Sequence, residues 1–348
     1  MSRSPNRIAV LDLAATSRNW SLPASGRKRL LANAPGGWEV RFVDSPTVSD
    51  GDGGTAPSPE ALNAVRDAEV YFGFGVSRAL FVAAPRLRWV HSAAAGVGAA
   101  LFPEMLASDA ILTNSAGIHA PPIAQHVVAG VIYLLRSFDI AVDQHRAGVW
   151  DKRPFTGDDS TVRELADCQA LIIGTGGLGQ AIASGLSHFG ARCVGVRRRP
   201  ALGAPPGIER VVGPDALEQE LPGADIVVLA TPATPATERL LTRERLAMLP
   251  RDAIVANVGR GSLLDEVALA DDLSAGRLRG AVLDVFSSEP LAPESRLWQL
   301  RQVLLTPHVS AVSPRRFWER QLDLFADNWT RYAAGKPMLN VVDKHAGY

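Results

Sequence analysis

The sequence predicts an α/β protein of two domains, each built around a parallel β-sheet. Its 348 residues exceed the usual size of a single hydrophobic core. Short apolar runs alternate with longer mixed segments along two separate stretches of the chain, which is typical of parallel strands joined by helices. With 47% hydrophobic and 21% charged residues, the composition is that of an ordinary globular protein.

The first series of apolar runs lies between residues 7 and 113. We expect its strands at 8–11, 40–43, 70–72, 89–91 and 111–113. An apolar helical pattern follows at 121–135, with prolines at positions that the first turn of a helix tolerates. This long helix is expected to join the two domains.

The second series predicts a doubly wound sheet. Its strands are expected at 171–173, 193–196, 226–229, 254–258, 281–283 and 303–305. Aromatic and apolar residues then recur at helical spacing over 314–332, before Gly335 ends the pattern. If this last helix packs back on the first domain, that domain is discontinuous: residues 1–118 and 311–348 form a flavodoxin-like domain, and 119–310 form the doubly wound one.

Charge and cysteine content narrow the class of protein. Thirty-six basic and 36 acidic side chains cancel, so no overall field would attract nucleic acid or an anionic membrane. Cys168 and Cys193 lack metal-ligand spacing and are expected to be buried thiols in a reducing compartment. The N-terminus leads directly into a strand pattern, and the longest apolar stretch, 127–135, is too short to span a bilayer. We expect a cytoplasmic protein with no metal site.

A glycine-rich loop opens the second series. It follows the apolar run 170–173 and leads into an alanine-rich helical pattern, which is the strand, turn and helix order of a dinucleotide-binding Rossmann domain. Small residues there let the backbone approach a pyrophosphate at the helix N-terminus. The residues assigned to this contact are Gly174, Gly176, Gly177, Leu178 and Gly179.

Arginines follow the next expected strand, where an acidic residue would usually bind the adenosine ribose. Arg197 and Arg198 at this position favour the 2′-phosphate of NADP over the free hydroxyl of NAD. The alternative has weight, because only four of the 36 basic residues are lysine and arginine is therefore common everywhere in this chain. NADP is the expected cofactor, with NAD as the alternative.

An arginine, an acid and a histidine each follow a later strand of the second series. These are Arg260, Glu289 and His308. Taken singly, each could be a surface or turn residue. Taken together, after a dinucleotide loop, a guanidinium can bind a carboxylate while an imidazole beside an acid moves a proton next to a hydride carrier.

Motifs along nearly the whole chain resemble those of the D-isomer-specific 2-hydroxyacid dehydrogenases, which include glyoxylate/hydroxypyruvate reductases. Besides the glycine loop and the three residues above, the resemblance rests on Gly96-Val-Gly98, Asn114-Ser-Ala-Gly117, Thr231-Pro232 and the segments 257–264, 281–290 and 305–308. It implies an enzyme that reduces a small 2-oxo acid, such as glyoxylate or hydroxypyruvate, by hydride transfer from NAD(P)H. It also implies a homodimer.

The resemblance assigns roles to individual residues. Arg260 would bind the substrate, His308 would act as acid and base, and Glu289 would orient the imidazole and favour its charged form. Thr231, Pro232, Val258 and Asp284 would contact the cofactor, although Asp284 could instead cap a turn. The backbone of Ala95, Gly96 and Val97 would hold the substrate carboxylate, with a plain turn as the alternative. His91, His119 and His126 are expected to be structural.

Two other readings stay open. A short phosphoglycerate dehydrogenase would share the architecture, although its common long forms carry an added C-terminal regulatory domain. Nucleotide-sensing corepressors also resemble this family, and they would bind the cofactor tightly with little turnover. Rapid reduction of a small 2-oxo acid would distinguish an enzyme from such a binding protein.

Overall fold

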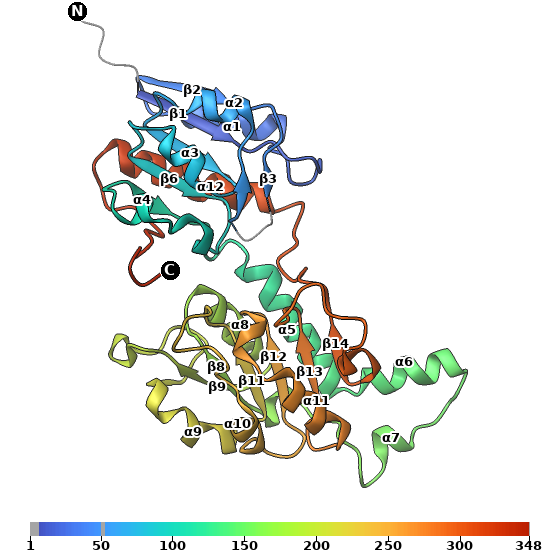
Figure 1. Cartoon of the computed structure of the whole chain (residues 1–348). Coiled ribbons are helices and arrows are strands. Elements are labelled where there is room, and N and C mark those ends of the chain that lie inside the picture. Colours follow the sequence, from blue (N-terminus) through green and yellow to red (C-terminus); the bar gives the residue numbers. More distant parts are fainter. Residues whose placement is uncertain (1–6, 50–52, 348) are drawn as a thin grey trace, which may run out of the picture. The chain divides into compact units, whose positions relative to one another are not determined.

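Two compact units make up the chain in the computed structural model, which describes residues 7–49 and 53–347 (Figure 1). The first unit combines Met1–His119 with Ser313–Tyr348, and the second is Ala120–Val312. Each unit has its own parallel sheet, with an apolar core layer on either face.

The first unit contains a five-stranded parallel sheet, and all five predicted strands are present. In spatial order they are β2(Trp38–Phe42), β1(Arg7–Asp12), β5(Val70–Gly73), β6(Trp89–Ser92) and β7(Ile111–Thr113). Numbered within this sheet the order is 2-1-3-4-5, the flavodoxin-like order, so this part of the predicted fold is confirmed. A small antiparallel pair, β3(Val48–Ser49) and β4(Thr55–Ala56), lies outside it.

Helices cover both faces of this sheet. α1(Ala24–Asn33) and α12(Phe317–Ala333) pack on one face, while α2(Pro59–Ala64), α3(Arg78–Val82) and α4(Pro103–Leu106) pack on the other. The C-terminal helix α12 is thus part of the first unit, and Gly335, at φ +64°, follows its end. Phe325 of α12 stacks on Phe72 and Trp89 of the sheet, with ring centroids 4.3 and 5.1 Å apart. These rings explain the aromatic spacing at the end of the sequence.

The second unit contains a seven-stranded parallel sheet. In spatial order its strands are β10(Arg210–Val212), β9(Arg192–Val196), β8(Gln169–Ile173), β11(Ile226–Leu229), β12(Ile254–Asn257), β13(Gly280–Leu283) and β14(Val303–Leu305). Numbered within the sheet the order is 3-2-1-4-5-6-7, so the predicted doubly wound fold is confirmed. The sequence reading missed β10, because this three-residue strand lies at the sheet edge and its side chains are partly or fully exposed.

Two layers of helices enclose the second sheet. α5(Ala120–Leu135) and α8(Gly177–His188) cover one face, whereas α9(Leu217–Glu220), α10(Arg243–Ala247) and α11(Glu266–Ser274) cover the other. Cys168 and Cys193 are buried free thiols, as expected, and burial raises the pKa of each to about 11. Short 3₁₀ segments lie at Gly98–Ala100 in the first unit and at Leu165–Asp167, Pro200–Leu202, Pro214–Ala216, Leu221–Gly223, Gly261–Leu263 and Arg296–Gln299 in the second.

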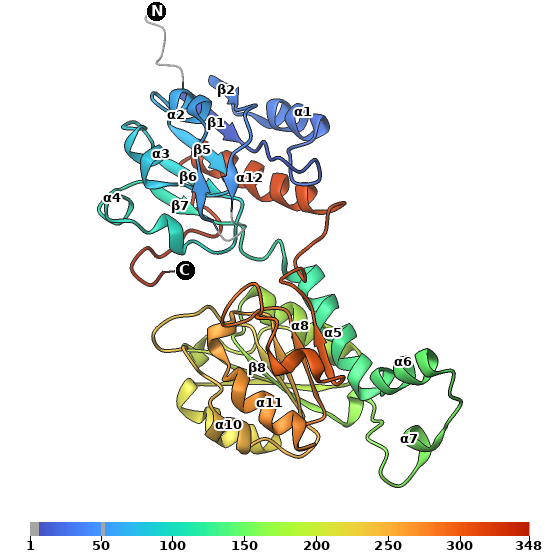
Figure 2. The same ribbon diagram turned by 45° about the vertical axis from the view of Figure 1, so that its right-hand side comes forward.

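The chain leaves α5 through a sharp bend into α6(Phe138–Ala147), and α7(Arg153–Thr156) follows. Both α6 and α7 project away from the sheet of the second unit (Figure 2). Within the described residues no single helix is long and apolar enough to cross a membrane, although α5 and α6 together, bent by 68°, would pass by length and composition.

A buried ion pair fixes the base of this projection. Arg279 donates to Asp139 at 2.6 Å, and their side chains are 7% and 2% exposed. The same guanidinium donates to the carbonyl of Leu134 at 2.6 Å, which ties the end of α5 to the start of α6. Ser137, between the two helices, has a φ of +54° and is fully buried. The ion pair therefore holds the bend in place.

We expect Asp139→Ala to destabilise the protein by about 3–5 kcal/mol, because Arg279 would remain as a buried, uncompensated charge. Urea denaturation followed by circular dichroism measures this loss. Asp143→Ala is the matched control on the same helix. Asp143 is 45% exposed and lies 3.9 Å from Arg301, so its loss should change stability by less than about 1 kcal/mol. Equal effects of the two substitutions would contradict a special role for the buried pair.

Candidate active site

The sheet of the second unit reverses its winding at β8, which has β9 on one side and β11 on the other. In doubly wound sheets ligands bind outside the carboxyl ends of the strands at such a point. The predicted residues of this unit follow strand ends in order. Gly174 follows β8, Thr231 lies two residues beyond β11, Val258 follows β12, Asp284 follows β13, and His308 lies three residues beyond β14.

The glycine loop has the geometry that a pyrophosphate requires. Gly174 has a φ of +98°, and a Cβ there would lie 2.6 Å from the carbonyl oxygen of Ala230. A Cβ on Gly179 would lie 1.8 Å from the carbonyl oxygen of Gly174, so the turn packs tightly on the first turn of α8. Gly176, the N-cap of α8, has nothing within 4 Å of its Cβ position, and no side chain caps the helix. The loop thus leaves the helix N-terminus open to an anion.

Other predicted cofactor residues surround this loop or follow nearby strands. Arg197 directly follows β9 and is half-buried, with its guanidinium donating to the carbonyl of Gly203 at 3.3 Å, whereas Arg198 is exposed. The carbonyl of Pro232 accepts from Thr237 at 2.7 Å, which shapes the loop after β11. Leu178 and Val258 contribute to the core between the sheet and helices α5 and α8.

His308 and Glu289 are in direct contact. The Nδ1 atom of the imidazole lies 2.8 Å from Oε2 of Glu289, and the two side chains are 45% and 36% exposed. The other carboxylate oxygen, Oε1, accepts from the backbone N–H of Phe286 at 2.9 Å. With both oxygens engaged, the carboxylate orients the ring, and Nε2 is the ring nitrogen through which His308 would reach a substrate. A protonated imidazole in this position forms an ion pair with Glu289.

Arg260 lies on a loop that packs against the loop of Glu289. Asn257 braces the Arg260 loop from the end of β12, since its amide donates to the carbonyl of Arg260 at 3.0 Å. A Cβ on Gly261 would lie 1.8 Å from the carbonyl carbon of Phe286. The two loops therefore touch backbone to backbone, at a point where only glycine fits. Tertiary packing thus brings the arginine loop beside the histidine and glutamate pair.

We expect Gly261→Ala to lower kcat/KM by about 10²-fold, because the new methyl group forces the Arg260 and Glu289 loops apart by an ångström or more. Steady-state kinetics with the preferred substrate measure this loss. Gly213→Ala is the control in the same unit, since its Cβ would have no neighbour closer than 4.0 Å. Unchanged kinetics in Gly261→Ala would show that the contact between the two loops does not set the position of Arg260.

Asp284 lies in the interior, where its side chain is 1% exposed. Both of its carboxylate oxygens accept hydrogen bonds from residues 306–310, the loop that carries His308. The sequence reading expected a cofactor contact, with a turn cap as the alternative. These hydrogen bonds cap the 306–310 loop, and the cofactor contact of Asp284 stays a prediction.

The loop of Ala95, Gly96 and Val97 belongs to the first unit and follows β6. Three successive carbonyls along it accept hydrogen bonds. Gln321 donates to Ala93 at 2.6 Å, the backbone N–H of Ser115 to Ala94 at 3.1 Å, and Asn114 to Ala95 at 2.7 Å. These hydrogen bonds fix the course of the chain from β6 into the predicted loop.

Sequence reasoning gave no role to the residues that brace this loop. Gln321 is fully buried on α12, and the side chain of Ser115 lies 2.7 Å from its Oε1. A signal was available: position 321 falls on the apolar stripe of α12, four residues after Phe317 and four before Phe325. A polar residue on a buried stripe indicates a specific hydrogen-bonding role.

Three histidines that the sequence predicts to be structural, His91, His119 and His126, contact neighbouring side chains. His91 is fully buried beside Phe72, and burial lowers its pKa to about 3, so its ring is neutral. His119 stacks on Phe317, with ring centroids 5.8 Å apart. His126 of α5 lies 3.3 Å from the hydroxyl of Thr306. No group of metal-binding side chains occurs within 7–49 and 53–347.

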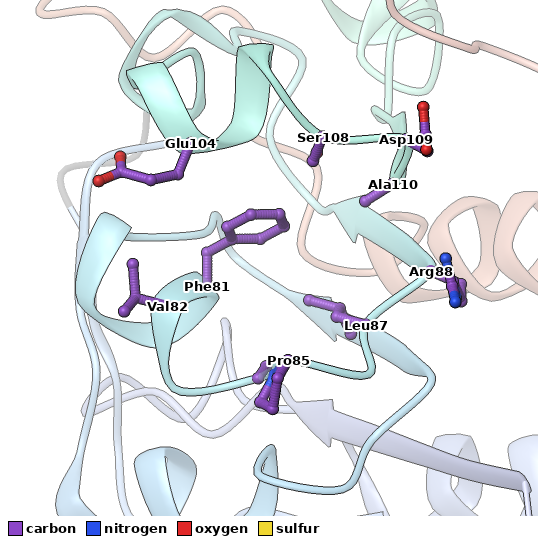
Figure 3. Close-up of a pocket in the computed structure, with 10 residues that line it drawn as sticks. Phe81, Val82, Pro85, Leu87, Arg88, Glu104, Ser108, Asp109 and Ala110 are labelled. Carbon is purple, nitrogen blue, oxygen red and sulfur yellow. The ribbon is translucent and has the colours of Figure 1, made fainter.

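A pocket of about 330 Å³ opens in the first unit, away from all predicted site residues of that unit (Figure 3). It lies between α3 and α4, with Phe81 and Leu87 among its apolar lining residues and Arg88 and Asp109 among the polar ones. Glu104, which also lines it, is paired with Arg78. The pocket holds none of the residues that the sequence singled out.

A family model for the NAD binding domain of D-isomer specific 2-hydroxyacid dehydrogenases matches residues 128–310, more than half of the chain. The chain belongs to this family. The predicted resemblance is therefore confirmed. The region that matches the dehydrogenase model contains the glycine loop, Arg260, Glu289 and His308.

Two named relatives align with more than three quarters of this chain. Glyoxylate/hydroxypyruvate reductase A of Salmonella newport is 31% identical over 277 residues, which cover 77% of this chain and 84% of that protein. D-3-phosphoglycerate dehydrogenase of Mycobacterium tuberculosis is 33% identical over 276 residues, covering 78% of this chain. The alignment spans 49% of that dehydrogenase, so the chain matches about half of its length.

Two solved structures match almost the whole chain. A D-isomer specific 2-hydroxyacid dehydrogenase from Xanthobacter autotrophicus, in complex with NADPH and MES, has a TM-score of 0.77 and 29% identity, covering 99% of this chain and all of that one. The NADPH-dependent glyoxylate/hydroxypyruvate reductase of Sinorhizobium meliloti has a TM-score of 0.75 and 27% identity, covering 98% of this chain and 100% of that one. Both likenesses extend over the two units.

Proposed function

We propose that this protein is an NAD(P)-dependent D-2-hydroxyacid dehydrogenase that reduces a small 2-oxo acid, such as glyoxylate or hydroxypyruvate. The observation that carries the proposal is the His308–Glu289 contact of 2.8 Å, beside the Arg260 loop and at the same sheet edge as an open glycine loop. These groups can bind a carboxylate, place a proton and hold a dinucleotide within one structural unit. Family membership supports the same chemistry.

The substrate carboxylate and ketone need cationic and N–H donors. In this proposal Arg260 binds the 2-oxo acid through charge-assisted hydrogen bonds from its planar guanidinium. We propose that the peptide N–H groups of Ala95, Gly96 and Val97 bind the carboxylate, on a loop whose entry is held by hydrogen bonds to the carbonyls of residues 93–95. Residues Met1–His119 and Ser313–Tyr348 would then form the substrate domain.

Reduction needs a hydride at the carbonyl carbon and a proton at the carbonyl oxygen. Bound NAD(P)H supplies the hydride. His308 donates the proton from Nε2 as negative charge develops on the oxygen, and Glu289 stabilises the imidazolium beforehand through Nδ1. The product is the 2-hydroxy acid, and His308 is left neutral, ready to take up a proton from water. In the oxidative direction the neutral imidazole accepts the proton instead.

The dinucleotide would lie on the second unit, Ala120–Val312. Gly174, Gly176, Gly177, Leu178 and Gly179 would hold its pyrophosphate, because the loop exposes backbone at the start of α8. Thr231, Pro232 and Val258, on the loops after β11 and β12, would line the remainder of the nucleotide. We further propose NADPH as the preferred donor.

Replacing both Arg197 and Arg198 by serine is expected to weaken NADPH binding selectively, because each guanidinium can pair with the 2′-phosphate after β9. A hydrogen bond to a charged group contributes about 1.5–3 kcal/mol, so we expect the Kd for NADPH to rise by about 10–100-fold. The Kd for NADH should change little. Fluorescence titration of both nucleotides measures this. Arg192→Ser, an exposed arginine at the start of β9, is the control. An equal loss for NADH and NADPH would contradict a 2′-phosphate contact.

We also propose a homodimer in the cytoplasm, with neither nucleic acid nor a membrane as partner. The projection formed by α6 and α7 supports the dimer, since Trp150 and Val149 on it are 90% and 51% exposed. Large apolar side chains on an extended segment are typical of an association surface. The zero net charge and the two buried free thiols agree with the location and partners proposed. Sedimentation velocity tests the assembly.

The function is tested by initial rates of NADPH and NADH oxidation with glyoxylate, hydroxypyruvate, 3-phosphohydroxypyruvate, pyruvate, phenylpyruvate and 2-oxoisocaproate. Rapid turnover of glyoxylate or hydroxypyruvate supports the proposal. A strong preference for the phosphorylated acid would favour the second candidate, a phosphoglycerate dehydrogenase, which the 33% identity to the mycobacterial enzyme suggests. Tight nucleotide binding without turnover of any acid would indicate a nucleotide-sensing, corepressor-like binding protein instead.

A further inference from the structure

The carboxylate of Asp284 is buried and accepts four hydrogen bonds from one short segment. Oδ1 accepts from the hydroxyl of Thr306 at 2.6 Å and from the backbone N–H of Val309 at 2.8 Å. Oδ2 accepts from the backbone N–H of Ser310 at 3.0 Å and from its hydroxyl at 2.5 Å. These donors lie immediately on both sides of His308. The carboxylate therefore holds the segment that carries the proposed proton donor at two points.

The backbone of Asp284 adds two more connections. Its carbonyl accepts from the N–H of His308 at 2.9 Å, and its own N–H donates to the carbonyl of Asn257 at 3.1 Å. Asn257 is the residue that braces the Arg260 loop. A single residue thus connects the end of β12, where the arginine loop begins, with the histidine loop after β14.

His308 itself has a φ of +53°, in the left-handed region. A non-glycine residue rarely adopts this conformation, and it persists where the surroundings hold the chain on either side. The hydrogen bonds to Asp284 from Thr306, Val309 and Ser310 supply that constraint. Without them, the loop would keep its backbone hydrogen bonds to Leu283 and Asp284 but lose the side-chain anchors on either side of His308.

An ionised carboxylate offers about four lone-pair positions for hydrogen bonds. Four donors from residues 306–310 occupy that capacity in Asp284. A ligand that needed the same oxygens would have to displace a donor from a side chain that is 1% exposed. The arrangement suits a carboxylate whose partners are within the protein.

We propose that Asp284 is a positioning residue, which acts through His308 by fixing the conformation of the 306–310 loop. The inference rests on the proposed function, in which His308 donates the proton. It extends to His126 of α5. The Thr306 hydroxyl gives its proton to Asp284, so it accepts from the Nε2–H of His126 at 3.3 Å, and helix α5 supports the same loop.

The test compares Asp284→Asn with the unmodified enzyme in kcat, in the solvent deuterium isotope effect and in the NADPH Kd by fluorescence titration. Asparagine has one acceptor oxygen, so an N–H group of the loop loses its partner. We expect kcat to fall by about 10²-fold, as for a catalytic group displaced by an ångström. Because proton transfer would become slower, the solvent isotope effect should rise. The NADPH Kd should stay within about threefold, since the dinucleotide keeps its contacts.

Thr306→Val provides a second variant that keeps the carboxylate and nearly the same side-chain volume. It removes one of the four hydrogen bonds to Asp284 and the contact to His126. A hydrogen bond of this kind contributes about 1–1.5 kcal/mol, so kcat should fall by about 10-fold. Asp271→Asn is the control, because Asp271 is a surface residue of the same unit, paired with Arg243 and Arg296. If Asp284→Asn fails to fold, the kcat of Thr306→Val tests the positioning role instead.

Two outcomes would overturn the inference. A weaker NADPH Kd with unchanged kcat at saturating cofactor would show that Asp284 binds the nicotinamide. Unchanged kcat in Asp284→Asn, or in Thr306→Val where the first variant does not fold, would show that the loop does not need this carboxylate. His308→Ala separates these failures from failure of the proposed function: if that variant keeps full turnover, His308 is not the proton donor. If it is inactive, a null result at Asp284 concerns the positioning role alone.

Discussion

Replacing His308 by alanine is expected to lower kcat for 2-oxo acid reduction by about 10²–10⁴-fold, the contribution of a positioned general acid. The imidazole is held by Glu289 at 2.8 Å, and alanine offers no group at this position that could donate a proton. The NADPH Kd should change little, because the glycine loop is untouched. Stopped-flow oxidation of NADPH under single-turnover conditions measures the loss in the chemical step.

The control for this substitution is His188→Ala. His188 lies in the last turn of α8, is exposed and contacts the ring of Phe189. It should retain full turnover. If His308→Ala keeps more than about a tenth of the original kcat, a loss of under 1.4 kcal/mol of transition-state stabilisation, His308 is not the proton donor.

Glu289→Gln tests the contact between the carboxylate and the imidazole. Glutamine keeps an oxygen that can accept from Nδ1 but has no negative charge to pair with a protonated ring. In the proposed mechanism we expect kcat for reduction to fall by about 10-fold, because a charged hydrogen bond of about 1.5–3 kcal/mol becomes a neutral one of about 0.5–1.5 kcal/mol. Stopped-flow oxidation of NADPH measures this loss. An unchanged kcat would leave Glu289 with the orienting role alone.

Replacing Arg260 by alanine is expected to lower kcat/KM by about 10²–10⁴-fold, since two charge-assisted hydrogen bonds to the substrate would be lost at 1.5–3 kcal/mol each. The effect should appear in both parameters, because in the proposed mechanism the guanidinium binds the carboxylate in the ground state and the carbonyl oxygen as charge develops. Initial-rate kinetics over a wide range of substrate concentration separate kcat from KM.

Arg260→Lys makes this prediction specific. Lysine keeps the charge but lacks the planar, two-pronged donor geometry, so most of the loss should remain. Arg251→Ala is the surface control: Arg251 is exposed and donates to the carbonyl of Gly276 at 3.3 Å. If Arg260→Lys restores nearly full kcat/KM, a point charge suffices and the bidentate contact is wrong. If Arg260→Ala itself is fully active, the substrate is bound elsewhere.

Much of the fold could be predicted because its signals are local. The apolar run 226–229, for example, is a complete buried strand whose side chains are apolar on both faces, as in most parallel sheets. β10 was not predicted because it lacks such a local signal. It lies at the sheet edge, begins with the exposed Arg210, and buries too little surface to leave an apolar run.

The candidate site could be predicted as a set of positions but not as a set of contacts. Parallel strands end at one edge of their sheet, so residues that follow β12, β13 and β14 are neighbours by topology. The hydrogen bond between His308 and Glu289 depends on the exact course of two loops, and periodicity does not encode it. Gln321 shows a similar limit, since its partners Ala93 and Ser115 are more than 200 residues away in sequence.

By itself, then, the sequence determined the two-domain α/β class, the dinucleotide loop and the candidate residues Arg260, Glu289 and His308, because apolar periodicity and glycine placement act over a few residues. The tertiary structure decided how these residues are held. It placed Gly261 against Phe286, and it directed the carboxylate of Asp284 to accept hydrogen bonds from the loop that carries His308. Such contacts arise where loops from separate strands meet, and their geometry follows from the packing of the whole unit.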